Sequence, residues 1–363
     1  MDRITSRQFL FFIPAVVIVS SKTYSSLFTH YGMRDTWIAT IIALIVVYFM
    51  MQFMLKVCQK KNCYDIHTIF KEAFGKVIGT LLLYVFYFSL FITLIESTSV
   101  EAGAMHYNFL IFNPVWGFLL LSVIAGFYVV AMGYRTVVIT VILGIVFISG
   151  SGFILAALTH MYKDFSRLLP ILENGLSSGF LLCILKLIAS FSSVFIIFPL
   201  LKDVVDKEKL PKMFNISYLY SAQIHVIAII GSLTTFEVPV ALTYPFVKLT
   251  QTERIMLLNF LEAGELFVML QIVVGWIVKF VTTFFILVQV LKKDGKSNVG
   301  MCFFIALIVY GASFLVGRNL FFLFECLNIY VDITFITFFV IPLITFVVYA
   351  VRGKKRQDDA YQT

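Results

Sequence analysis

Apolar runs recur along almost the whole chain, and they constrain its fold more than any other feature. Each is roughly twenty residues long, which is enough to cross the hydrocarbon core of a bilayer as one helix. Of the 363 residues, 60% are hydrophobic and 13% are charged, whereas a soluble domain carries about 25% charged residues. The sequence therefore predicts an all-α integral membrane protein, with residues 1–363 forming a single transmembrane domain in the lipid bilayer.

Polar segments divide the chain into ten membrane spans, at about residues 9–29, 36–57, 77–99, 115–133, 136–159, 177–201, 213–235, 263–291, 299–317 and 331–350. Ten spans place both termini on one side of the membrane. Of the 28 Lys and Arg residues, nineteen fall in segments on that side, six in segments on the other side and three within spans. Because cytoplasmic loops are enriched in Lys and Arg, this bias predicts cytoplasmic N- and C-termini. It also accounts for the net charge of +8 without a nucleic-acid partner.

The middle of the first span is unusually polar for a segment inside lipid. Ser20, Ser21, Lys22 and Thr23 follow one another there, with apolar residues on both sides. A lysine at the centre of a spanning helix costs about 2.5–3.5 kcal/mol, so such a residue usually faces a cavity, an opposite charge or a ligand. We expect these four residues to form half of a small-molecule site in the middle of the membrane.

Ten spans can also be two sets of five. Many transporters consist of two inverted repeats and hold their ligand where the corresponding helices are broken. Span six would then correspond to span one, and its middle carries Ser190, Ser192 and Ser193, with Lys186 one turn earlier. The sequence thus predicts a five-plus-five inverted repeat with discontinuous spans one and six. The two repeats and the tail would cover about residues 1–160, 161–350 and 351–363.

Spans three and eight hold the other clear candidates for buried polar groups. Glu96 lies toward the outer end of span three, and Gln271 and Lys279 lie within span eight. Two plainer interpretations remain open: a serine can bond to its own helix backbone or tighten helix packing, and Lys22 and Glu96 could form a structural ion pair. The predicted ligand-binding residues are Ser20, Ser21, Lys22, Thr23, Glu96, Ser190, Ser192, Ser193, Gln271 and Lys279.

Two segments between spans are predicted to be helical. In residues 65–75, Ile66, Ile69 and Phe70 recur at helical spacing, and Asp65 is placed to cap the first turn. This pattern predicts an amphipathic helix on the cytoplasmic membrane face, with a solvated loop as the alternative. In the outer segment 236–262, residues 250–260 could form a short helix over the outer mouth of the bundle.

The sequence carries no pattern typical of an enzyme. It contains no Gly-rich phosphate loop and no nucleophile elbow, and its five histidines are scattered. Cys58, Cys63 and His67 match none of the standard metal-ligand spacings. We therefore expect no catalytic residues, no bound metal and no cofactor.

The chain resembles the spore germination permease family, the membrane B subunit of GerA-class germinant receptors within the amino acid–polyamine–organocation transporter superfamily. No single segment is specific, but their order, their spacing and the ten-span frame together carry the resemblance. The segments include residues 4–8 before span one, 35–38 at the start of span two, 74–79 before span three, Asn113-Pro114, residues 168–172 with Gly175, Tyr244-Pro245, and Glu262 with Glu265.

The resemblance implies a five-plus-five inverted repeat and the sensing of a nutrient germinant, usually an amino acid, in the spore inner membrane. It implies that the protein acts together with an A-type and a C-type receptor subunit. It also implies a ligand-binding site among spans one, three, six and eight. Members of the superfamily usually carry glycines where span one unwinds, whereas Ser20, Ser21 and Lys22 stand here. We expect Lys22 to supply positive charge at a milder break.

Several functions remain open at this point. The leading hypothesis is a receptor subunit in which a mid-membrane ligand shifts an equilibrium that partner subunits detect. The alternative is a secondary active amino-acid transporter, in which Glu96 or a lysine could carry the proton of a proton-coupled mechanism. A membrane enzyme and a purely structural scaffold are weaker hypotheses.

Overall fold

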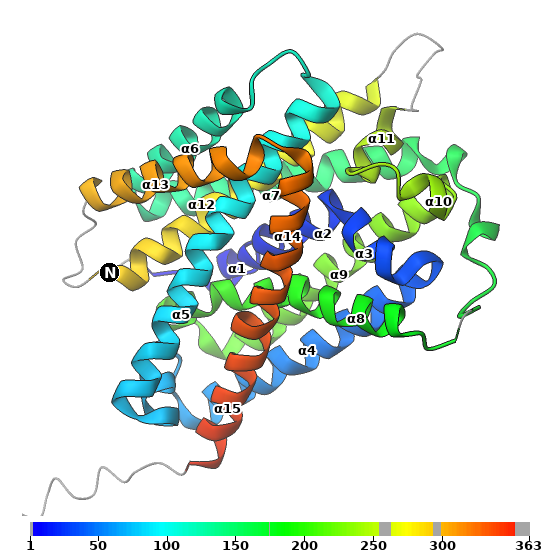
Figure 1. Ribbon diagram of the computed structural model, residues 1–363. Coiled ribbons are helices and arrows are strands. Elements are labelled where there is room, and N and C mark those ends of the chain that lie inside the picture. Colours follow the sequence, from blue (N-terminus) through cyan, green and yellow to red (C-terminus); the bar gives the residue numbers. More distant parts are fainter. Residues whose placement is uncertain (1–2, 174, 254–262, 293–298, 353–363) are drawn as a thin grey trace, which may run out of the picture.

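The computed structural model describes residues 3–173, 175–253, 263–292 and 299–352. In these ranges the protein is all-helical, with 87% of residues in helices and no strands. Eight helical segments are long and apolar enough to cross a membrane, and the apolar helix α6 is shorter, at 17 residues. Figure 1 shows the helices gathered into one bundle.

The helices have the following bounds, with η marking the 3₁₀ and π segments: α1 (Ser6–Phe9), α2 (Phe12–Thr23), α3 (Ser25–Gly32), η1 (Met33–Asp35), α4 (Thr36–Lys61), α5 (Ile66–Ala104), η2 (Met105–Phe109), α6 (Val115–Ala131), α7 (Tyr134–Leu158), η3 (His160–Tyr162), η4 (Phe165–Leu168), α8 (Ser178–Phe191), η5 (Ser192–Asp203), η6 (Lys207–Lys209), α9 (Leu210–Thr235), α10 (Val238–Ala241), α11 (Val247–Glu253), α12 (Ala263–Leu291), α13 (Val299–Gly317), α14 (Leu320–Thr334), η7 (Phe335–Val340) and α15 (Ile341–Val351). Below, "inner" and "outer" refer to the orientation that the Lys and Arg bias predicts.

The first predicted span is interrupted at Tyr24. This residue has φ −107° and ψ 45°, outside the helical region, and it separates α2 from α3. Because the chain restarts as a helix at Ser25, the interruption covers a single residue. The break is therefore mild, as expected for a segment without glycine.

The sixth predicted span changes helix type instead of unwinding. It runs as the α-helix α8 to Phe191 and continues as the 3₁₀-helix η5 from Ser192 to Asp203. Runs of 3₁₀-helix longer than three or four residues are uncommon, and this one has twelve residues. Spans one and six thus both depart from a regular α-helix close to their polar clusters.

The predicted helix at residues 65–75 is present. Asp65 accepts a hydrogen bond from the Thr68 backbone N–H, at 3.1 Å, and so caps its first turn. Gly75 then has φ 82° and ψ 173°, outside the helical region. It therefore separates this short helix from the long remainder of α5. A side chain at Gly79 would lie 2.4 Å from the Phe70 carbonyl oxygen, so the two parts of α5 approach closely.

The start of the chain is tied to the segment that follows span six. The backbone N–H and the hydroxyl of Ser6 both donate to the Asp206 carboxylate, each at 2.6 Å. These bonds lower the pKa of Asp206. Ile4 and Val204 add an isolated parallel bridge beside them. The N-terminal segment is therefore held against residues 203–206, where η5 ends.

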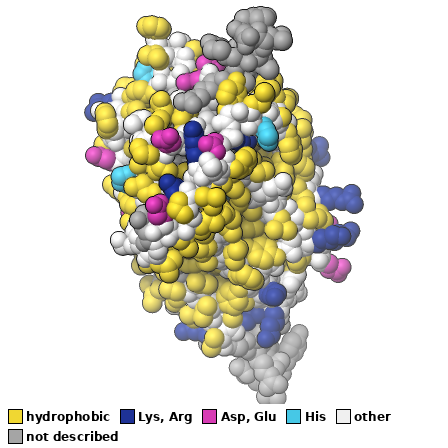
Figure 2. All heavy atoms as spheres, turned by 90° about the vertical axis from the view of Figure 1, so that its right-hand side faces the viewer, with side chains coloured by type: hydrophobic (Ala, Val, Ile, Leu, Met, Phe, Trp, Pro, Cys, Tyr) yellow, Lys and Arg dark blue, Asp and Glu magenta, His cyan; other side chains and the backbone are white. Residues whose placement is uncertain are grey.

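The outer segment between α9 and α12 is partly helical. It contains α10 and α11, and α11 begins at Val247, three residues before the predicted helix at 250–260. Residues 254–262 and the tail from residue 353 lie outside the described residues. Figure 2 shows hydrophobic side chains over much of one face of the molecule, which is typical of a surface that contacts lipid.

Candidate functional site

Three consecutive residues of α2 point toward three different neighbours. Successive residues of an α-helix are about 100° apart around its axis. Ser20 faces α5 and α12, Ser21 faces α9, and Lys22 faces α7 and the outer part of α12. The polar stretch of span one therefore contributes to more than one site.

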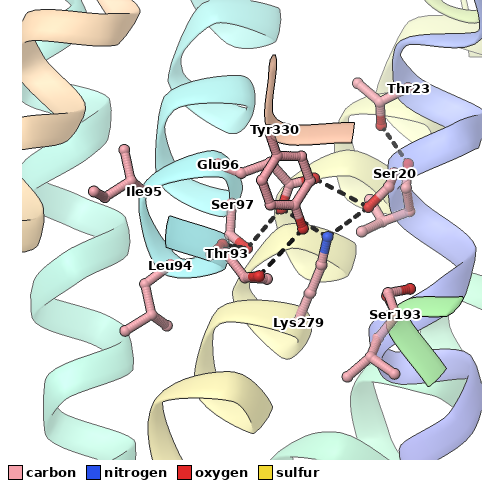
Figure 3. Close-up of polar contacts among 12 residues, drawn as sticks. Ser20, Thr23, Thr93, Leu94, Ile95, Glu96, Ser97, Ser193, Lys279 and Tyr330 are labelled. Atoms are coloured by element: carbon pink, nitrogen blue, oxygen red, sulfur yellow. Dashed lines mark hydrogen bonds and ion pairs between the residues drawn. The ribbon is translucent and has the colours of Figure 1, made fainter. Parts of the chain in front are cut away.

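Ser20, Glu96 and Lys279 form a closed triangle in the core of the bundle. Lys279 Nζ lies 2.7 Å from Glu96 Oε2 and 2.6 Å from Ser20 Oγ. The Ser20 hydroxyl donates in turn to Glu96 Oε1 at 3.1 Å. Figure 3 shows the three side chains converging from spans one, three and eight. Each is almost fully buried, with 1% exposure for Lys279 and 4% for Glu96.

Other hydroxyl groups and aromatic rings enclose this triangle. Tyr24, the residue at the break in span one, donates from its hydroxyl to Glu96 Oε1 at 3.0 Å. Its ring stacks on Trp276 with the centroids 6.3 Å apart, and Lys279 Nζ lies 5.2 Å from the Trp276 ring centroid. Tyr330 from α14 packs on the lysine from another side, at 5.8 Å. The break in span one is thus bonded directly to the buried ion pair.

Burial makes this ion pair costly to disrupt. Removing one member of a buried pair leaves an uncompensated charge, which typically destabilises a protein by about 3–5 kcal/mol. Replacing both members with uncharged residues of similar volume is often nearly neutral. The chemistry therefore allows two low-energy states for each charge: bonded to the other, or bonded to an added group of opposite sign.

Lys22 lines a separate cavity on the other side of α2. Its ammonium donates to Gln271 Oε1, while Gln271 Nε2 donates to the Ile148 backbone carbonyl of α7 at 3.1 Å. The cavity has a volume of about 70 Å³ and lies among α2, α7, α9, α11 and α12. Two further lysines, Lys163 and Lys248, line it with Lys22.

An open hollow of about 490 Å³ lies at the outer end of the bundle, between α3, the segment before α11, and α14. Ser26 and Tyr31 of α3 line it opposite Glu325 and Asn328 of α14. The Tyr31 hydroxyl reaches Asn328 Oδ1 at 3.5 Å, and the Ser26 hydroxyl donates to the Pro245 carbonyl at 2.5 Å. The hollow is therefore walled by the outer half of the broken span.

Comparison with known sequences decides the family. Residues 3–320 match the family-wide sequence model described as spore germination protein. The chain belongs to the spore germination protein family. No curated protein matches it. The match covers most of the chain, including every helix that contributes to the buried triangle except α14, which it reaches only at Leu320.

The family match confirms the resemblance found in the sequence. It supports a membrane protein with a role in spore germination.

In this spore germination protein, the predicted site residues separate into three groups. Ser20, Glu96 and Lys279 meet at the ion pair, and Lys22 and Gln271 meet at the lysine-lined cavity. The rest bond elsewhere: Ser21 Oγ pairs with His225 of α9, and the Thr23 hydroxyl donates to the Val19 carbonyl of its own helix, at 2.8 Å. The predicted alternative of a Lys22–Glu96 ion pair is not the arrangement found, because Glu96 bonds to Lys279.

The serines of span six do not converge on either place. The Ser192 hydroxyl donates to the Ile188 carbonyl of its own helix at 2.6 Å, and Ser193 donates to the Val16 carbonyl of α2 at 3.2 Å. The Ser190 hydroxyl is buried and has no hydrogen-bond partner. The Ser193 contact joins spans one and six next to the polar stretch.

Several residues at these places were not predicted from the sequence. Ser21 Oγ lies 2.7 Å from His225 Nδ1, although this histidine had been set aside as scattered. Tyr24 lies in the polar stretch and could have been chosen because a tyrosine hydroxyl needs a partner when buried. Lys163 and Lys248 lie between the predicted spans, among the six Lys and Arg residues on the outer side. Nothing in the local sequence distinguishes them from solvated lysines.

Proposed function

We propose that this protein is the membrane subunit of a spore germinant receptor, and that a small zwitterionic nutrient, most simply an amino acid, binds between Glu96 and Lys279. The nutrient's ammonium group would replace Lys279 as the partner of Glu96, and its carboxylate would replace Glu96 as the partner of Lys279. The observation that carries this proposal is the buried 2.7 Å ion pair bonded to the break in span one.

The free and bound states would then be balanced electrostatically. Without ligand the two charges neutralise each other, and with ligand each has a new opposite charge, so neither state buries a lone charge. A ligand with only one charge would leave one protein charge unpaired. The site therefore favours zwitterions over simple amines and acids.

Binding would be coupled to the outer half of span one. The Tyr24 hydroxyl donates to the same carboxylate oxygen of Glu96 as the Ser20 hydroxyl does. When Glu96 turns toward a ligand, Tyr24 loses or remakes this bond, and α3 starts one residue later. Such a change shifts the population of a bundle state that partner subunits can detect. The hollow beside α3 offers the route from the outer side.

The remaining parts of the hypothesis follow from the family. We propose a ten-span, five-plus-five inverted repeat in the spore inner membrane with cytoplasmic termini, acting with A-type and C-type receptor subunits. The Lys and Arg bias supports the orientation, and the two irregular spans support the repeat.

A second candidate function, proton-coupled secondary transport, rests on Glu101. This carboxylic acid is 3% exposed and accepts a hydrogen bond from Ser122 Oγ at 2.6 Å. Among the described ion pairs, none includes Glu101. A buried carboxyl group without a cation is suited to bind and release a proton. Saturable, gradient-driven amino-acid uptake by this chain in proteoliposomes would favour transport over sensing.

Germination of spores that carry paired variants tests the receptor proposal. The double variant Glu96→Gln with Lys279→Met removes both charges and so leaves no lone charge in the core. We expect it to reach normal membrane levels and to lose the response to nutrient. The control, Glu173→Gln, alters the ion pair of 3.1 Å between Arg34 and Glu173, whose side chains are both solvent-accessible, and is expected to keep the response. A normal dose–response in the double variant would reject the site.

A further inference from the structure

A second polar region lies on the opposite side of α2 from the ion pair. The charged side chains that line it are all positive. The cavity of about 70 Å³ is lined by Lys22 of α2, Lys163 of the segment after α7, and Lys248 of α11. A smaller cavity of about 20 Å³ adjoins it and shares Lys22 and Lys248. Neither cavity has an Asp or Glu among the described residues that line it.

The three lysines have no opposite charge nearby in the described part of the chain. None of them takes part in any of its ion pairs. The carboxylate next in sequence, Asp164, is engaged by the Ser166 hydroxyl at 2.6 Å and by Arg167 at 3.7 Å. Three ammonium groups around one hollow therefore lack counter-charges.

Neutral groups hold these lysines in place. Lys248 Nζ donates to Gln251 Oε1 at 2.6 Å, and Gln251 Nε2 bonds to the Gly231 carbonyl at 3.0 Å and to Thr235 Oγ1 at 2.6 Å. Lys22 is positioned in the same way by Gln271. Lys22 and Lys248 are thus each oriented by an amide group that leaves the charge of the lysine uncompensated.

The loop that carries Lys163 is also fixed to α9. Asp164 N–H donates to the Thr234 carbonyl at 2.9 Å, and the Arg167 guanidinium donates to the Thr235 carbonyl at 2.6 Å. A Cβ at Gly231 would lie 3.6 Å from Lys248 Nζ and 3.8 Å from Lys163 Cε, so both side chains end over the same point of α9. The arrangement is built by four separate elements.

An ammonium group has three N–H donors, and most of these donors are unused here. Lys22 and Lys248 each make one side-chain hydrogen bond, and Lys163 makes none among the described residues. Burial and the charges of Lys22 and Lys163 lower the pKa of Lys248 to about 7, as expected where cations crowd together. An oxyanion would accept these donors and neutralise the charge in one step.

We infer that this cavity binds an oxyanion group, a carboxylate or a phosphate, through Lys22, Lys163 and Lys248. The site is independent of the Glu96–Lys279 site proposed above. A volume of about 70 Å³ is several times the roughly 10–15 Å³ that one water needs, so a compact anionic group fits. Phe153 and Ile227, which line one side, are 67% and 43% exposed on the apolar surface of the bundle. The oxyanion can therefore belong to a small solute or to the headgroup of an anionic lipid.

Two binding measurements on the purified full-length protein separate these sources. The protein is reconstituted in phosphatidylcholine nanodiscs, and its thermal unfolding midpoint is measured as sodium phosphate or sodium acetate is added. Sodium chloride is the ionic-strength control. In parallel, native mass spectrometry scores the retention of phosphatidylglycerol. The variants are Lys163→Gln and Lys248→Gln. The matched control is Lys60→Gln, an exposed lysine at the inner end.

If the oxyanion is a small solute, phosphate or acetate raises the thermal unfolding midpoint. Each cavity variant then raises the half-saturating concentration at least ten-fold, whereas Lys60→Gln does not. For a lipid headgroup, phosphatidylglycerol is retained by the native protein and the control, and its retention falls at least ten-fold in the cavity variants. Either result supports the site. No binding of any probe, or equal binding by all variants, overturns it. Lys163→Gln lies in a loop and keeps the test usable if Lys248→Gln fails to fold.

Discussion

The two sides of α2 bury positive charge in opposite ways. On one side Lys279 is matched by Glu96, a serine and two tyrosines, and the region is tightly packed. On the other side Lys22, Lys163 and Lys248 surround a hollow, and Lys22 and Lys248 have neutral amides as their partners. The comparison teaches that a buried lysine can be matched by a carboxylate or left without an opposite charge, and that only its neighbours distinguish the two.

The largest effect is expected on the matched side. Glu96→Ala leaves Lys279 as a lone charge in the core, and we expect a loss of about 3–5 kcal/mol in the free energy of unfolding. Chemical denaturation in detergent measures it. The control is the double variant Glu96→Gln with Lys279→Met, which should recover most of that loss. An equal loss in both would show that packing, and not charge, governs the effect.

A smaller loss is expected from Ser20→Ala. The Ser20 hydroxyl accepts from Lys279 and donates to Glu96, so its removal leaves two buried polar groups one hydrogen bond short. A deficit of this kind costs about 1–3 kcal/mol. The same denaturation assay measures it. Thr23→Val is the matched control, because the Thr23 hydroxyl bonds only within its own helix, and it should change stability by about 0.5 kcal/mol or less. Similar losses in the two variants would contradict the assignment.

Removing a lysine from the side without a carboxylate should have the opposite effect on stability. Lys248→Met removes a cation that has no opposite charge, so in buffer without oxyanions we expect the thermal unfolding midpoint to rise slightly or stay unchanged. Lys279→Met alone should lower it clearly. A large drop for Lys248→Met would mean that this lysine has a structural partner and that the comparison between the two sides fails.

Stability should also depend on pH through Lys248. Its folded-state pKa is lowered to about 7, while an unfolded lysine titrates near about 10.4. Between these values the unfolded state binds more protons, so this residue makes stability rise as pH increases from about 7 toward 10. Thermal midpoints of the native protein and Lys248→Met across that range measure the difference. A native curve that falls relative to the variant would contradict the sign.

The all-helical membrane character was predictable because hydrophobic length acts over whole segments. The apolar runs indicated an all-helical membrane protein, and the Asp65 cap indicated the helix before Gly75. The long 3₁₀ stretch from Ser192 to Asp203 was not predictable: Pro199 disfavours an α-helix around it, but nothing local explains why the change begins at Ser192. The break in span one was expected from its polar stretch, but its exact position at Tyr24 was not.

The residue types of the candidate site were predictable from the sequence, but which residues pair with one another was not. Glu96 and Lys279 stood out because ionisable groups are rare in apolar spans. Which lysine meets Glu96 depends on how each helix is rotated, and the sequence does not record that. Span six shows the limit most clearly: its serines matched those of span one in position, but Ser192 bonds to its own backbone. Lys163 and Lys248 were missed because in sequence they are ordinary loop lysines.

The central claim is that a zwitterion opens the Glu96–Lys279 pair, and ligand chemistry tests it most directly. An amino acid that triggers germination is compared with its decarboxylated amine and its deaminated acid, using spores whose receptor contains this protein. The account predicts a response to the amino acid alone, and loss of that response in the double variant Glu96→Gln with Lys279→Met. A full response to the amine or the acid, or an unchanged response in the double variant, would contradict it.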